Sequence, residues 1–268
     1  MSGSHKLLPK ISLLIVTYRR LAYLKQSLAM LDRYPNLEVI IMNNDPSDDI
    51  SELYDCFPDL ELNIIEHSPN DFLQARNTAL AHVTGDYICL LDDDDILLPG
   101  HFQNGISALE QVDFVHNAAE LLLFRLSEGK REVLSRSPFY FLQDSAFIRR
   151  YSYFIPSGAM YHRSLHDELG VFDPDVRNYW DWDFYLRVLV SKQVAYLPSA
   201  TTLYFIPEGE GSLSHESQFS KRKPYLDYFT KKHSLGQLPV ENFLTMLDSE
   251  DCKAHKQTPD LVWDGCLA

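Results

Sequence analysis

Apolar and polar residues follow one another along the first 110 residues in a pattern that predicts strands and helices in turn. Short apolar runs typical of strands occupy Ile11–Tyr18, Leu37–Met42, Leu62–Glu66 and Asp86–Leu91. Between the first two, leucines recur at three- and four-residue steps within Arg20–Arg33, which predicts one apolar face of a helix. A further helix is expected over residues 72–83. This alternation favours right-handed βαβ units and an open, mainly parallel sheet.

Polar clusters follow three of the predicted strands. They are Thr17–Arg19, Asn43–Asp45 and Asp92–Asp95. Ligands of open parallel sheets bind beyond the carboxyl ends of the strands. The sequence therefore predicts that these clusters converge on one binding site.

The second half of the chain has a less regular pattern. Strands are expected at Phe114–Phe124 and Val194–Ile206, and helices at Leu165–Leu169 and Phe184–Val190. The segment Pro207–Ser217 carries glycine and serine residues, so we expect a mobile loop there. Residues 221–268 are expected to form a helical extension or tail behind the main domain of residues 1–220.

Composition and charge limit the class of protein. With 268 residues, 45% of them hydrophobic, the chain can bury an ordinary globular core. Its formal net charge of −14 repels phosphate backbones, which argues against a nucleic-acid partner. Four scattered cysteines without a CxxC pair indicate reduced thiols in the cytoplasm. No apolar run reaches the roughly 20 residues that span a bilayer, so any membrane contact is expected to be peripheral, at the inner face.

The four consecutive aspartates Asp92–Asp95 are the strongest chemical signal. Carboxylates this close repel one another and raise one another's pKa, so a positive group is expected beside them. Hard divalent cations, Mg²⁺ or Mn²⁺, prefer such oxygen ligands and often share them with substrate phosphates. The alternative is a solvated turn in which Asp95 caps a short helix. The buried strand that precedes the aspartates favours the cation.

Several segments, in the same order along the chain, match the motifs of one known family. Val16–Arg20 (VTYRR) ends the first predicted strand, and Leu91–Pro99 (LDDDDILLP) contains the aspartates. The other matching segments are Met42–Asp48, Ala75–Asn77, Thr84–Tyr87, Met160–Asp173 and Trp180–Arg187. Together they resemble the GT-A glycosyltransferases of family 2, and the resemblance extends from about Ile11 to His215.

The resemblance implies a GT-A fold, in which helices flank a mainly parallel central sheet and a smaller mixed region forms the acceptor side. It implies a nucleotide-sugar half over about residues 10–112 and an acceptor half over about 113–220. The implied activity is metal-dependent, inverting transfer of a sugar from a nucleoside diphosphate donor, with a UDP-sugar favoured. The acceptor would be a hydroxyl of a saccharide or glycolipid, in bacterial-type polysaccharide or glycoconjugate synthesis.

Carried over position by position, the resemblance also implies site residues. Asp181 would be the catalytic base, and Asp94 would bind Mn²⁺ or Mg²⁺. Trp180, Trp182 and His215 are candidates for contact with the acceptor or the diphosphate. The nucleotide would be bound by Thr17, Tyr18, Arg19, Asn44, Arg76, Asp92 and Asp93. Two purely structural roles remain as alternatives. Asp181 would cap a helix starting at Trp182, and Arg76 would form an ion pair with one of the aspartates.

Departures from the family pattern leave some questions open. Both positions of the acidic pair on the second strand are asparagines, Asn43 and Asn44, and an amide donates as well as accepts, so the nucleotide base is left open. A nucleotidyltransferase is one alternative, although Val16–Leu21 lacks the glycine that its phosphate loop usually contains. A non-catalytic module that binds a divalent cation or a sugar is the other.

Overall fold

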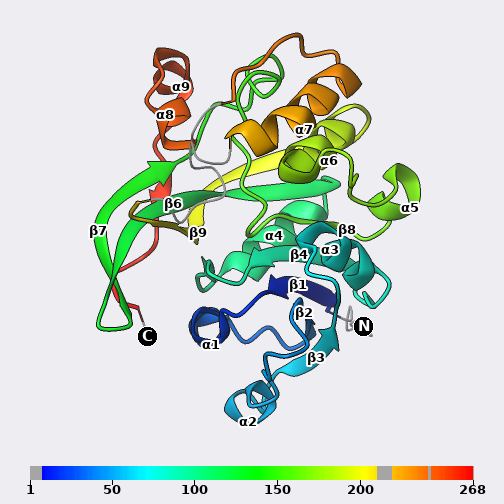
Figure 1. The fold of residues 1–268 in the computed structure, drawn as a ribbon, viewed down its shortest axis with the longest axis vertical. Helices are drawn as coiled ribbons and strands as arrows, with labels where there is room; N and C mark the ends of the chain where they lie inside the picture. The colour runs from blue at the N-terminus through cyan, green and yellow to red at the C-terminus, as the bar shows by residue number, and fades with distance from the viewer. Residues whose placement is uncertain (1–7, 210–218, 241–242, 268) are drawn as a thin grey trace, which may run out of the picture.

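The fold was analysed in a computed structural model that describes residues 8–209, 219–240 and 243–267. Four parallel strands form one half of its sheet, in the order β3-β2-β1-β4. They are β1 (Ile11–Thr17), β2 (Leu37–Asn43), β3 (Glu61–Glu66) and β4 (Tyr87–Asp92). This arrangement confirms the predicted open parallel sheet (Figure 1).

The sheet continues with strands of mixed direction. The short β8 (Met160–His162) runs antiparallel between β4 and the long β6 (Phe114–Ser127), and β6 pairs in parallel with β9 (Val194–Pro207). Three further strands attach to β6 and β9, namely β7 (Lys130–Phe139), β5 (Ile96–Leu97) and β10 (Asp260–Leu261). The hairpin of β6 and β7 projects to one side in Figure 1.

Helices cover both faces of this sheet. Helices α1 (Leu21–Met30), α2 (Leu53–Cys56) and α4 (His101–Leu109) share one apolar core with the sheet. The other core includes residues of α3 (Phe72–Leu80), α5 (Leu165–Leu169), α6 (Trp180–Leu189) and α7 (Phe219–Lys232). The remaining helices are the 3₁₀ turn η1 (Arg177–Tyr179), α8 (Phe243–Leu247) and α9 (Glu250–His255).

The two cores explain why the strands read as continuous apolar runs. In β1, Leu13 and Ile15 belong to the core under α1, while Leu14 belongs to the core under α3. In β2, Val39 and Ile40 divide between the two cores in the same way. Successive side chains of a strand point to opposite faces, so a sheet buried on both faces favours apolar residues at nearly every position. Ser12 on β1 and Glu38 on β2 are buried polar exceptions, and the Ser12 hydroxyl donates a hydrogen bond to the Glu38 carboxylate.

The structure differs from the elements predicted from the sequence at β7 and at the start of α6. Strand β7 was not predicted, because most of its side chains are polar and at least partly exposed. Helix α6 begins at Trp180 and therefore starts one turn before the predicted Phe184. Residues 210–218, most of the predicted mobile loop, lie outside the described part of the chain. Within the described residues, no helix combines the length and apolar character needed to cross a bilayer.

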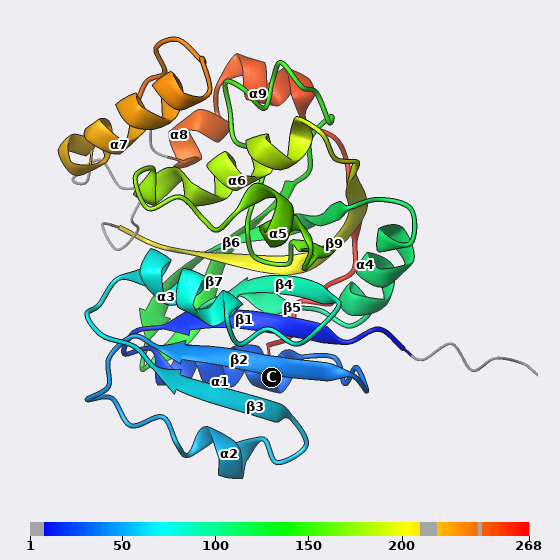
Figure 2. The ribbon, with the colours of Figure 1, turned by 90° about the vertical axis from the view of Figure 1, so that its right-hand side faces the viewer.

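A buried group of charged residues fixes α7 to α6. Asp183 is fully buried on α6, and its carboxylate lies 2.8 Å from Nε of Arg187, 2.6 Å from Nζ of Lys232 and 2.7 Å from Nε2 of His233. Burial raises the pKa of Asp183, but the hydrogen bonds from His233 and Lys232 outweigh it, so the pKa is lowered overall. Helices α6 and α7 lie side by side in Figures 1 and 2. The segment after residue 218 is therefore tied to the helix that carries Asp181.

We predict that Asp183→Asn lowers the free energy of unfolding by about 3 kcal/mol, because it removes the charge that balances Arg187 and Lys232 and the carboxylate that bonds to His233. The measurement is urea unfolding at pH 7. Asp227→Asn, on the exposed face of α7, is the matched control and should change stability little. Since the pKa of Asp183 is lowered on folding, its contribution is complete above its unfolded value of about 3.9 and is lost as the pH falls. Equal stabilities of the two variants would contradict this role.

Candidate active site

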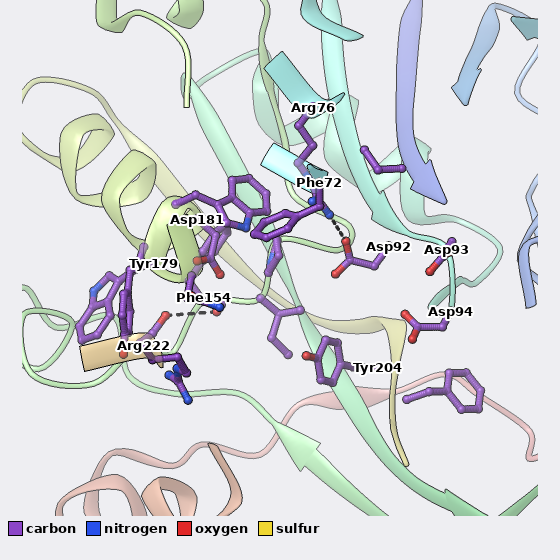
Figure 3. A pocket seen from close by; sticks show the side chains of 18 of the residues that line it. Phe72, Arg76, Asp92, Asp93, Asp94, Phe154, Tyr179, Asp181, Tyr204 and Arg222 are labelled. Atoms are coloured by element: carbon purple, nitrogen blue, oxygen red, sulfur yellow. Dashed lines mark hydrogen bonds and ion pairs between the residues drawn. The ribbon is translucent and has the colours of Figure 1, made fainter. Parts of the chain in front are cut away.

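A cavity of about 500 Å³ opens at the carboxyl ends of the parallel strands. Thr17 reaches it from the end of β1, Asn44 from the residue after β2, and Asp92, Asp93 and Asp94 from the end of β4. The three polar clusters predicted to converge thus each contribute to one site. The opposite wall comes from α6, from α7 and from the segment before β8. Figure 3 shows the acidic residues on one side of this cavity and Asp181 with Arg222 on the other.

Two of the aspartates share one arginine. Nη1 of Arg20 lies 2.6 Å from Asp94 and 3.3 Å from Asp93, and the hydroxyl of Thr17 donates a 2.8 Å hydrogen bond to Asp93. Burial, then the charge of Asp94, raises the pKa of Asp93 to about 6. Burial also raises the pKa of Asp94, against the opposing effect of Arg20. The charge of Arg131 also lowers the pKa of Asp94, yet the pKa values of both aspartates stay raised. The nearby arginines therefore do not fully balance the negative charge of this turn.

Asp92 has a separate cation. Its carboxylate pairs with the guanidinium of Arg76, so the alternative in which Arg76 pairs with one of the aspartates is confirmed, and its contact with the nucleotide stays a prediction. The same guanidinium lies 4.6 Å from the ring centroid of Trp180 and 5.7 Å from that of Phe72. Arg76 is consequently held between the acidic turn and the first turn of α6.

Asp95 has a structural role that differs from that of its neighbours. It is buried, accepts a hydrogen bond from the hydroxyl of Ser157, and accepts a 3.0 Å bond from the backbone N–H of Phe205 on β9. The alternative of a helix cap is wrong, because Ile96–Leu97 form strand β5. Asp95 thus joins the end of β4 to β9 and to the segment before β8.

Asp181 lies in the first turn of α6 and faces the cavity. Burial raises its pKa to about 6, although the backbone N–H of Trp182 opposes the shift. Trp180 and Trp182 are both buried, and the indole N–H of Trp182 donates a 2.8 Å bond to the carbonyl of Ile148. Because the helix begins at Trp180, the interpretation of Asp181 as the cap of a helix starting at Trp182 is wrong. Asp181 is a carboxylate suited to accept a proton near neutral pH.

Some of the residues expected to bind the nucleotide line the cavity, and others do not. Tyr18 and Asn44 line the cavity, and the Asn44 amide donates a 2.7 Å hydrogen bond to the side-chain oxygen of Asn70. Arg19 is not among the lining residues, and its guanidinium pairs with Asp45 on the outside of the site. The positive φ of 55° at Arg19 turns the backbone at this point. His215 lies outside the described residues.

Sequence reasoning missed several lining residues. Arg20 ends the segment Val16–Arg20 that resembles the family motif, but the resemblance assigns it no role. Tyr204 on β9 and Tyr179 and Arg222 near α7 also line the cavity. Their local sequences carry no signal for this, because only the packing of β9 and α7 against the sheet brings them to the site.

The acidic turn by itself does not complete the ligand shell of a divalent cation. Among the described residues, no group of three His, Cys, Asp or Glu side chains is arranged to hold a metal. Asp94 and its neighbours offer oxygen ligands with surplus negative charge, and Mg²⁺ commonly takes only one or two carboxylates, completing its shell with substrate phosphates and water. The turn therefore fits a cation that arrives with a diphosphate.

Comparisons with known proteins agree with this fold and site. The family model described as glycosyl transferase family 2 matches residues 12–170. The chain is 39% identical over 260 residues to a Bacillus subtilis protein described as the uncharacterized glycosyltransferase YwdF, and the match covers 96% of both chains. An uncharacterized glycosyltransferase of Rickettsia bellii is 28% identical over 109 residues, covering 40% of this chain and 16% of that protein.

Two solved structures share the fold. S. aureus TarS in complex with UDP-GlcNAc is 17% identical with a TM-score of 0.60, over 89% of this chain and 72% of that chain. The mannosyltransferase PcManGT from Pyrobaculum calidifontis, in complex with GDP-Man and Mn²⁺, is 17% identical with a TM-score of 0.60, over 90% and 69%. The family model covers more than half of this chain and the B. subtilis relative matches nearly all of it, so the chain belongs to glycosyltransferase family 2.

Proposed function

We propose that this glycosyltransferase is metal-dependent and inverting, and moves a hexose from a nucleoside diphosphate donor to an acceptor hydroxyl. A UDP-sugar is the favoured donor, and a saccharide or glycolipid is the acceptor, in polysaccharide or glycoconjugate synthesis. The observation that carries the proposal is that the acidic turn Asp92–Asp94 and the half-buried Asp181 face one cavity from opposite sides. We further propose a cytoplasmic location, with peripheral contact at the inner face of the membrane.

The donor would lie along the end of the parallel strands. Tyr18 and Asn44 line the part of the cavity suited to the nucleoside, and Thr17 holds Asp93 in place. Mn²⁺ or Mg²⁺ held by Asp94, with Asp92 and Asp93 close by, would offset the negative charge that develops on the departing diphosphate. Arg19 is left out of this proposal because its charge is already paired with Asp45.

Asp181 would be the general base. Its carboxylate takes the proton of the acceptor hydroxyl while the hydroxyl oxygen bonds to the anomeric carbon, and the bond from that carbon to the diphosphate oxygen breaks. One displacement by one base inverts the anomeric configuration. A pKa of about 6 leaves the carboxylate mostly ionised at neutral pH and still able to hold a proton. Trp180 and Trp182, on either side of it along α6, would exclude water from this step.

The product separates this reaction from the nucleotidyltransferase alternative. A glycosyltransferase releases a nucleoside diphosphate, whereas a nucleotidyltransferase releases pyrophosphate. Incubating the protein with a panel of nucleotide sugars and Mn²⁺, and identifying the released phosphate compound, tests the reaction class. Release of pyrophosphate would reject the proposal.

We predict that Asp181→Asn lowers kcat by 10²- to 10⁴-fold, the usual contribution of a general base, while donor affinity changes little. The measurement is transfer of labelled sugar, with donor binding followed by calorimetry. Asp175→Asn, an exposed aspartate just before η1, is the matched control. Near-normal turnover of Asp181→Asn would assign the base to another residue.

The pH dependence of kcat/KM provides an independent test. Because the base acts only when deprotonated, and because burial raises the pKa of Asp181 to about 6, activity should rise with pH up to about 6 and level off above it. Below that value kcat/KM should fall about tenfold per pH unit. Asp93 also titrates near pH 6, so donor affinity must be measured over the same range. An activity profile that is level down to pH 4.5 would contradict the assignment.

We predict that Asp94→Ala abolishes metal-dependent binding of the nucleoside diphosphate, because the cation loses its expected protein ligand. Calorimetric titration of UDP with and without Mn²⁺ measures this. The exposed Asp49→Ala should bind like the natural protein. If Asp94→Ala retains the difference between the titrations with and without Mn²⁺, the metal is held elsewhere.

A further inference from the structure

The wall of the cavity that faces the acidic turn is made largely by segments outside the nucleotide half. Arg150 and Phe154 come from the connection between β7 and β8, and Arg222 and Leu226 come from α7. Met246 on α8 completes this wall. Its chemistry therefore bears on what binds opposite the donor.

The position of Arg222 is fixed by the packing of α7. Arg222, Leu226 and Phe229 recur at four- and three-residue steps, so they share one face of the helix. Phe229 is fully buried, with its ring centroid 5.5 Å from that of Tyr179 and 4.8 Å from that of Trp182. The guanidinium of Arg222 lies 5.3 Å from the Tyr179 ring centroid, at the cavity. Packing of the helix thus holds the Arg222 guanidinium against Tyr179, which precedes Asp181 by two residues in the chain.

A second cation lines the same wall. Arg150 lies 2.8 Å from the carboxylate of Asp251 on α9, and its guanidinium is 5.2 Å from the ring centroid of Tyr151. Its side chain lines the cavity and is 61% exposed, although Asp251 already offsets part of its charge. Arginine offers a planar, forked set of donors that matches phosphate oxygens.

Apolar side chains make up much of the remaining wall. Leu226, Phe154 and Ile155 are buried residues with a surface on the cavity, and Leu238 and Met246 are half-buried beside them. Among the residues that the structure describes, the neutral hydrogen-bonding side chains on this wall are Ser152 and Asn178 with the hydroxyls of Tyr151 and Tyr179. An acceptor made only of sugar hydroxyls would leave this apolar surface without a matching partner.

The distribution of charge points to an anion at this wall. The chain carries a net charge of −14 and so repels anions over most of its surface. Among the described acidic residues that line the cavity, Asp92–Asp94 lie at the donor side and Asp181 lies on the opposite side with Arg222. Arg150 already pairs with Asp251, so Arg222 is the main cation of this wall.

We propose that the acceptor is an amphiphile whose reactive hydroxyl lies close to a phosphate group that is attached to an apolar chain. Arg222 and Arg150 would bind the phosphate, and the surface around Leu226 and Met246 would contact the first part of the chain. This inference rests on the proposed function, because it identifies the wall opposite the donor as the acceptor site.

The test uses simple probes for the two properties. Binding of n-decyl phosphate, n-decyl maltoside and inorganic phosphate, each below micelle-forming concentrations, is measured by calorimetry on the full chain with Mn²⁺ and UDP present. We expect n-decyl phosphate to bind at least tenfold more tightly than the other two. Arg222→Gln should weaken it about tenfold, the scale of one lost charged hydrogen bond. The control is Lys223→Gln, which removes the same charge from the exposed neighbour on α7.

The outcomes separate clearly. If n-decyl maltoside binds as well as n-decyl phosphate, no anion is required, and if inorganic phosphate binds as well, the apolar wall is not used. Equal effects of Arg222→Gln and Lys223→Gln would remove Arg222 from the site. Each of these results overturns the inference. Metal-dependent binding of UDP is measured alongside, in the unaltered protein and in the same variants. If the unaltered protein shows no metal-dependent UDP binding, that result would instead reject the proposed function.

Discussion

The site depends on the way the fold holds an excess of carboxylates at the end of one buried strand. Asp95 anchors the turn, because it bonds to Ser157 and to the backbone of Phe205 and so ties β4 to β9. With the turn fixed, Asp92 and Asp94 face the cavity and are balanced only in part, by Arg76 and Arg20. Like charges held together in this way raise one another's pKa and create a demand for a further cation. The two apolar cores that bury the strand offset the energetic cost of holding these carboxylates close together.

Helix α6 connects the chemistry to the C-terminal segment. Successive residues of a helix are turned by 100°, so Asp181 and Asp183, two positions apart, lie on nearly opposite sides. Asp181 faces the cavity, and Asp183 receives Lys232 and His233 from the end of α7. The same helix thus positions the proposed base and holds the segment that supplies Arg222. The expected boundary at residue 220 stays a prediction, but the cavity is built from both sides of it.

Much of the fold and part of the site could be predicted from the sequence, for identifiable physical reasons. A strand buried on both faces is apolar at nearly every position, as Leu13 and Leu14 illustrate. The turn that follows such a strand is rich in polar residues. Side chains such as Arg222 and Tyr204 were missed because their roles arise from packing between distant segments, which leaves no local pattern. Arg19 is the reverse case, a residue that a motif marks as part of the site but that does not line the cavity. Its guanidinium pairs with Asp45 instead.

The two sides of the cavity also act on each other electrostatically. Arg76 pairs with Asp92 and stacks on Trp180, so its charge lies between the acidic turn and Asp181. The charge of Asp92 raises the pKa of Asp181 and that of Arg76 lowers it, while burial remains the largest cause of its shift. The readiness of the proposed base to accept a proton therefore depends on charges at the donor side. Because Arg76 contacts both sides of the cavity, the proposed donor site and the proposed base belong to one connected group of side chains.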